Sequence, residues 1–289
     1  MHTSARLRIA SAVLAILSPA AWADTPQAQT PQASAPAQTI TDAYRLFYNA
    51  RYEEAAAIAM SLRASGTQDL ENDEVRTSAL IFQLRGLLNG QDARDKDNDN
   101  KSEVLKRCAK CPEVLASFMT DLHHGQELAR SRLKAKPNDE EALFFLGKLD
   151  LNFVWLELGL LGHKTGWDEY WEARKSLDAV LKQNPKHVRA RIARGWIDYI
   201  VNTRMPWGTR WVLGGGNKKR GMAAVREATI MEADQYTRAE AEFALWDMNV
   251  REKNFEVATG VAEKLARDFP ENQEVAKFLA TRRAPRETR

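Results

Sequence analysis

Two cysteines are the residues best suited to chemistry in this chain. Cys108 and Cys111 have the spacing C-x-x-C directly before Pro112, which suits the first turn of a helix. Haem attachment needs a histidine where Pro112 stands, and a thioredoxin-type pair needs a β-α-β context that the chain lacks. In an oxidising compartment we expect a disulfide. A redox pair, or a zinc site completed by His123 or His124, stays open as an alternative.

A second candidate is an acidic segment that has the opening of a calcium loop. Asp95, Asp97 and Asp99 place carboxylates at its first, third and fifth positions. Asn100 stands where such a loop has glycine, and Lys106 stands where it has glutamate. We therefore expect an inserted, solvated loop at this segment.

A third candidate is the glycine run 214–216, which the basic residues 218–220 follow. A glycine-rich entrance to a helix presents free N–H groups to an anion. The run lacks the lysine followed by serine or threonine of a phosphate loop. A connector with a solvated basic turn is the expectation here, and an anion site is the alternative.

Catalytic patterns do not stand out in the sequence. His123, His124, His163 and His187 lie in no H-E-x-x-H pattern, and no G-x-S-x-G elbow occurs. We expect no enzymatic activity, no cofactor and no bound metal.

Six of the eight tryptophans fall between residues 155 and 211, a concentration that suggests either a packed core or a contact surface. They are Trp155, Trp167, Trp171, Trp196, Trp207 and Trp211. Trp167 and Trp171 lie one turn apart, as expected of core positions. Trp207 and Trp211 flank proline and glycine, and we expect these two on a binding surface.

The N-terminus predicts export. Arg6 and Arg8 precede an apolar run that ends before Pro19, and Ala21-Trp22-Ala23 provides small residues for cleavage. The run is too short to span a membrane, so we expect cleavage after Ala23, a periplasmic protein and no transmembrane segment. Removing residues 1–23 lowers the formal charge from +3 to +1, which argues against nucleic-acid binding.

Pattern and composition predict an all-α fold. Residues 24–39 are rich in proline, glutamine and alanine and read as a disordered linker, and residues 282–289 read as a flexible basic tail. Between them, residues 40–281 carry helical spacing without strand-like alternation. The apolar stretch 142–161 is interrupted by four polar residues, so we expect a buried helix, with lipid binding as the alternative.

Prolines divide this region at similar junctions. Pro137, Pro185 and Pro270 each follow a Leu-rich helix end, and a small residue such as Gly147 or Gly195 recurs after them. Proline disfavours helix before it and suits a first turn, so each should end one helix and begin the next. The small residues should let paired helices approach closely.

In these features residues 40–281 resemble the tetratricopeptide repeat family, whose period is about 34 residues. Aligning Pro185 with the family's terminal proline places Ala173, Leu177 and Val180 at packing positions. Pro137 and Pro185 are 48 residues apart, so we place an extended helix at 151–164 and a further insertion around 204–216. The resemblance implies an α-solenoid of antiparallel hairpins with extended helices and inserted loops.

The resemblance also implies a concave groove lined by the first helices of the hairpins. It places in the groove Glu141, Phe144, Lys148 and Leu151 from one unit, and Arg189, Ile192, Trp196 and Tyr199 from the next. We expect a non-catalytic scaffold that binds a protein or peptide of the cell envelope. The alternatives are a lipid- or glycan-binding protein, and a redox or metal protein acting through the cysteine pair. The oligomeric state is not predicted.

Overall fold

The computed structural model describes residues 38–64, 70–92, 105–163 and 165–283. These residues form helices and no strand, which confirms the all-α prediction. The predicted signal peptide, nearly all of the predicted linker, the calcium-like loop 95–100 and the end of the basic tail lie outside the described residues.

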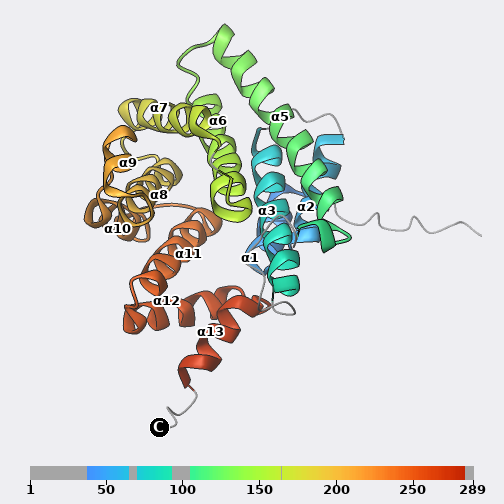
Figure 1. Cartoon of the computed structure of the whole chain (residues 1–289), viewed down its shortest axis with the longest axis vertical. Helices are drawn as coiled ribbons and strands as arrows, with labels where there is room; N and C mark the ends of the chain where they lie inside the picture. The colour runs from blue at the N-terminus through green and yellow to red at the C-terminus, as the bar shows by residue number, and fades with distance from the viewer. Residues whose placement is uncertain (1–37, 65–69, 93–104, 164, 284–289) are drawn as a thin grey trace, which may run out of the picture. The chain divides into compact units, whose positions relative to one another are not determined.

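Apart from the short α9, consecutive helices pack against each other along the described chain (Figure 1). The α-helices are α1 (Ile40–Tyr48), α2 (Tyr52–Ala64), α3 (Leu70–Asp92), α5 (Cys111–Ala135), α6 (Glu140–Val154), α7 (Trp167–Gln183), α8 (Val188–Arg204), α9 (Trp207–Val212), α10 (Lys218–Ala228), α11 (Gln235–Arg251), α12 (Phe255–Asp268) and α13 (Gln273–Arg283). A π-helical segment, η1 (Trp155–Leu161), continues α6. The expected extension of that helix is therefore present, but its hydrogen bonds change from the α-helical to the π-helical pattern after Val154.

The proline junctions lie where the sequence predicts them. Pro137 separates α5 from α6, Pro185 separates α7 from α8, and Pro270 separates α12 from α13. Polar side chains cap all three helices that follow, and at α13 Asn272 accepts a hydrogen bond from the amide of Val275 at 3.1 Å. Asp139 accepts a hydrogen bond from the amide of Ala142 at 3.1 Å. His187 accepts one from Ala190 at 3.1 Å, and all three bonds satisfy free N–H groups at a helix start.

Glycines allow the closest helix contacts, as expected from the small residues after each proline. A Cβ on Gly147 would lie 2.9 Å from Leu177 of α7. Gly195 of α8 and Gly221 of α10 meet backbone to backbone, and a Cβ on Gly221 would overlap the carbonyl oxygen of Gly195. The packing positions Ala173, Leu177 and Val180 are fully buried.

The first helix also packs against the end of the chain. The Tyr48 ring stacks on Phe243 of α11 at 5.5 Å and contacts Phe269 at 5.4 Å. The side-chain amide of Asn272 donates to the carbonyl oxygen of Tyr48 at 2.8 Å. These contacts place α1 against α11, and the Tyr44 hydroxyl of α1 accepts a hydrogen bond from Arg189, one of the residues that the repeat pattern assigns to the groove.

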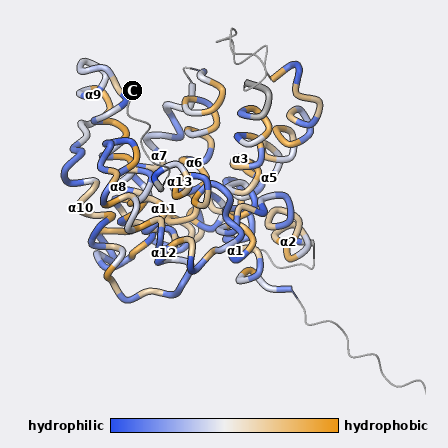
Figure 2. Tube along the Cα trace, turned by 90° about the horizontal axis from the view of Figure 1, so that it is seen from below, coloured by the Kyte–Doolittle hydropathy of each residue, from blue (hydrophilic) through white to orange (hydrophobic). Residues whose placement is uncertain are grey.

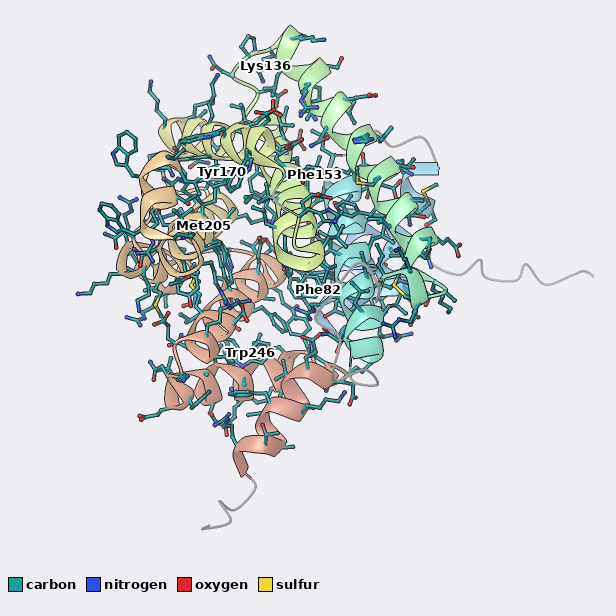
Figure 3. All side chains as sticks on the ribbon, viewed as in Figure 1. Phe82, Lys136, Phe153, Tyr170, Met205 and Trp246 are labelled. Atoms are coloured by element: carbon teal, nitrogen blue, oxygen red, sulfur yellow. A yellow bond between two sulfur atoms is a disulfide. The ribbon has the colours of Figure 1, made fainter. Side chains whose placement is uncertain are left out.

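Hydrophilic and hydrophobic residues both occur along each helix, as expected of helices with one apolar and one polar face (Figure 2). Among the described helices none has the length and apolar character needed to cross a bilayer. Figure 3 shows Tyr170, which belongs to α7, near the α9 segment. It also shows Met205 close to the start of α9.

Candidate binding site

A cluster of charged side chains lies where α1, α3, α6, α8 and α11 meet. Arg189 of α8 is its centre, and its guanidinium contacts Glu74 of α3 at 2.7 Å and Glu240 of α11 at 2.8 Å. It also donates to the Tyr44 hydroxyl at 3.1 Å, and that hydroxyl donates to Glu71 at 2.7 Å. The rings of residues 44, 144 and 145 surround the guanidinium at 5.0–5.9 Å. We call Tyr44, Glu74, Lys148, Arg189 and Glu240 the Arg189 cluster.

Lys148 of α6 completes the ion pairs of the cluster. Its ammonium group lies 2.6 Å from Glu240 and 3.4 Å from Glu74. Burial opposes ionisation of Glu240, but the charges of Lys148 and Arg189 outweigh it and lower the pKa of that carboxyl to about 2. Glu240 is therefore ionised at neutral pH, and against the effect of burial its charge helps to raise the pKa of Lys148 and of Arg189, so both of these cations keep their charge as well. Because the carboxylates of α3 and α11 share both cations, these helices are held against α6 and α8.

An open pocket of about 400 Å³ lies beside the Arg189 cluster. Its lining comprises Ile40, Thr41, Tyr44, Tyr48, Glu71, Arg189, Asp234, Gln235, Tyr236, Thr237 and Glu240. The rings of Tyr44, Tyr48 and Tyr236 stack in it with centroids 5.7–6.4 Å apart. We call this the tyrosine pocket.

The tyrosine pocket has a negative charge balance. Glu71, Asp234 and Glu240 face Arg189 as the single cation of the lining. Burial opposes ionisation of Asp234, but hydrogen bonds from the start of α11 outweigh it and lower the pKa of that carboxyl. Arg189 is further neutralised by a carboxylate of α3 outside the lining. The lining of the pocket thus combines aromatic faces with more carboxylates than cations, which is a surface suited to a cation.

The groove-facing residues predicted from the repeat pattern lie mostly in the interior. Phe144, Ile192 and Tyr199 are 2%, 1% and 1% exposed, and the Tyr199 hydroxyl donates to Glu252 at 3.0 Å. Trp196 is half-buried and meets Tyr199 edge to face at 5.6 Å. An open face at these residues is not observed, which corrects that expectation. The reason is that α1, α3, α10 and α11 cover them.

Trp207 and Trp211 have the opposite environment. They are 87% and 85% exposed on α9, the short helix that fills the inserted segment. Their position on the surface agrees with the expectation from the flanking proline and glycine. Neither indole is packed into a core of the described chain.

The cysteines lie at the start of α5. The sulfur atoms of Cys108 and Cys111 are at disulfide distance, with the Cα atoms 5.3 Å apart, and both residues are buried. Pro112 occupies the first turn of the helix as predicted. Redox or metal chemistry at this pair stays a prediction.

The sequence prediction missed the acidic half of the cluster. Asn72, Asp73 and Glu74 form a polar run that the sequence alone suggests is solvated, yet each is no more than 3% exposed. The one available signal was that Lys148 and Arg189 each lie on a helix face that is otherwise mostly apolar, since a buried cation needs a carboxylate partner.

Comparisons of the chain with protein-family models, with curated proteins and with solved structures found no match.

Proposed function

We propose that this chain is a non-catalytic helical scaffold of the cell envelope that binds a partner protein or peptide through the tyrosine pocket. The observation that carries the proposal is the pocket's lining of three tyrosine rings and three carboxylates with one compensated cation. Such a lining favours a lysine or arginine side chain presented by the partner. The aliphatic stem would lie on the rings and the charged head would meet the carboxylates.

The tetratricopeptide-like arrangement is part of the same proposal. Its support is the packing of consecutive helices, the proline junctions and the backbone contact of Gly195 with Gly221. In this arrangement the helices that carry the Arg189 cluster form the inner wall. The proposed binding surface is then the tyrosine pocket, between α1 and the start of α11. The rest of the inner wall is not open to a ligand, because side chains of the neighbouring helices cover it.

The test removes charge from the pocket while keeping the hydrogen bonds that Tyr44 and the start of α11 donate to it. In the variant Glu71→Gln with Asp234→Asn, the amide oxygens still accept from Tyr44 and from the start of α11. Mature protein carrying these changes would be used to capture partners from a detergent-free envelope extract, with mass spectrometry of the retained proteins. We expect capture to fall at least tenfold with an unchanged melting temperature.

The matched control is Glu256→Gln with Asp268→Asn, which removes two exposed carboxylates from α12, outside the pocket. This control should capture the same proteins as the wild type. Equal capture by the folded pocket variant would refute the proposed site.

A further inference from the structure

The segment around α9 carries only one sign of charge. From Tyr199 to Arg226 the sequence has six basic residues and no acidic one, namely Arg204, Arg210, Lys218, Lys219, Arg220 and Arg226. Asp198 pairs with Arg220, and Glu252 pairs with Lys218. Arg204 and Lys219 form no ion pair with any carboxylate of the described chain, and both are exposed. The surface beside α9 is therefore positively charged.

The fold brings these cations to the base of α9 from both sides. Arg204 ends α8 just before α9, and Lys219 lies in the first turn of α10 just after it. Gly216, just before α10, packs directly against α8, because a Cβ at this position would lie only 2.6 Å from the backbone nitrogen of Asn202 in the last turn of α8. The exposed indoles of α9 thus lie on a segment that an exposed cation precedes and another follows.

Contacts from α7 hold the α9 segment in place. The Arg174 guanidinium donates to the carbonyl oxygens of Leu213 and Gly214 at 2.9 and 3.0 Å. The Tyr170 hydroxyl donates to the same Leu213 oxygen at 2.9 Å, and the Leu213 side chain is buried. The carbonyl groups that end α9 are therefore fixed to α7, and the exposed side chains are presented by an anchored turn.

We propose that Trp207 and Trp211, with Val212 beside them and with Arg204 and Lys219 around them, dock on the surface of a bilayer that contains anionic phospholipid. Tryptophan partitions to the headgroup level because its ring is apolar and its N–H is polar. Basic side chains add attraction to anionic headgroups. The combination of two exposed indoles with a segment that carries six basic residues and no acidic one fits the surface of an anionic bilayer. The site is separate from the tyrosine pocket and does not depend on it.

The experiment is co-sedimentation of the mature protein with vesicles. Vesicles of phosphatidylglycerol with phosphatidylethanolamine should retain it, and vesicles of phosphatidylcholine alone should not. Raising the salt concentration to about 0.5 M should weaken retention, since exposed charges are then largely screened. Brominated acyl chains should quench tryptophan fluorescence in the anionic vesicles.

Three variants separate the contributions. Trp207→Ser with Trp211→Ser should lower the partition coefficient at least tenfold, and Arg204→Gln with Lys219→Gln should lower it about fivefold for each charge. Ile230→Ser is the matched control, because Ile230 is 85% exposed but lies past the opposite end of α10. It should bind like the wild type.

Two results would overturn the proposal. One is equal retention of the wild type and the double tryptophan variant on anionic vesicles, or no retention of either. The other is a protein captured from a lipid-free extract only when both tryptophans are present, which would assign the surface to protein recognition. Loss of vesicle binding with intact partner capture would leave the tyrosine pocket standing.

Discussion

The Arg189 cluster and the α9 segment use similar residues for different purposes. Both contain arginine beside aromatic rings, and by residue type both are typical of contact surfaces. In the cluster the arginine is paired with two carboxylates and enclosed by rings. In the α9 segment Trp207 and Trp211 are exposed, and the cations beside them include unpaired ones. Pairing and burial, rather than residue type, therefore separate a structural centre from a surface available to a ligand.

The largest expected effect is in the Arg189 cluster. Arg189→Met should lower the free energy of unfolding by about 3–5 kcal/mol, because it leaves Glu74 and Glu240 buried with one cation between them. Urea unfolding followed by circular dichroism measures the change. The exposed control Arg204→Met should change stability by less than about 0.5 kcal/mol. Equal stability of both variants would show that the cluster is not the structural centre.

The next effect is on the pH dependence of stability, and it concerns a second buried ionisable group, Asp150 of α6. Burial raises its pKa to about 8, and one of its oxygens has no hydrogen-bond partner among the described atoms. The unfolded chain loses this proton near pH 4, while the folded chain keeps it up to about pH 8. The contribution of Asp150 to the free energy of unfolding should therefore be greatest below pH 4 and should fall between pH 4 and 8, by up to ~1.4 kcal/mol per pH unit.

The variant Asp150→Asn isolates this contribution, since the amide does not ionise and its oxygen can accept from Gln126 as Asp150 does at 2.7 Å. Unfolding free energies measured from pH 4 to 8 should fall more steeply in the wild type than in the variant. Parallel pH profiles for the two proteins would contradict the raised pKa.

A smaller effect is expected where α8 and α10 meet beneath the α9 segment. Gly221→Ala should cost about 1–3 kcal/mol, because the added methyl group overlaps the carbonyl oxygen of Gly195. Gly260→Ala in α12 is the control, since no atom lies within 4 Å of a Cβ there. It should stabilise the protein by roughly 0.5–1 kcal/mol through helix propensity. Thermal melts of the two variants should move in opposite directions.

The smallest effect is expected for the exposed indoles. Trp207→Ser with Trp211→Ser should change the free energy of unfolding by less than about 0.5 kcal/mol, because neither side chain is packed. Urea unfolding of the double variant beside the wild type measures this. A loss of several kcal/mol would place these rings in a core and remove the contrast with the Arg189 cluster.

Local sequence signals predicted the helices well. The prolines at 137, 185 and 270 mark helix boundaries because their effect on the backbone is local. Gly195 and Gly221 mark a close helix contact for the same reason, since only a missing Cβ permits it. Trp207 and Trp211 were identified as surface residues from the proline and glycine next to them.

The candidate site was predicted less well, because it depends on contacts between distant segments. The repeat pattern assigned Tyr199 and Ile192 to an open face, but side chains of α10 and α11 cover these two residues, and no local pattern reports the approach of α11. Glu74 and Glu240 lie on helices whose sequences give no sign that these carboxylates are buried. Their role follows only from the cations that they meet across the fold.

The central claim is that the tyrosine pocket accepts a cationic side chain. The most direct measurement is an NMR titration of the mature, isotope-labelled protein with acetyl-Gly-Arg-Gly-amide and with the matched citrulline peptide, which has nearly the same shape but no charge. We expect the arginine peptide to shift the amide signals of Tyr236 and Thr237, which line the pocket, and the citrulline peptide to bind roughly tenfold more weakly or less. Equal shifts with both peptides, or no shift with either, would contradict the account.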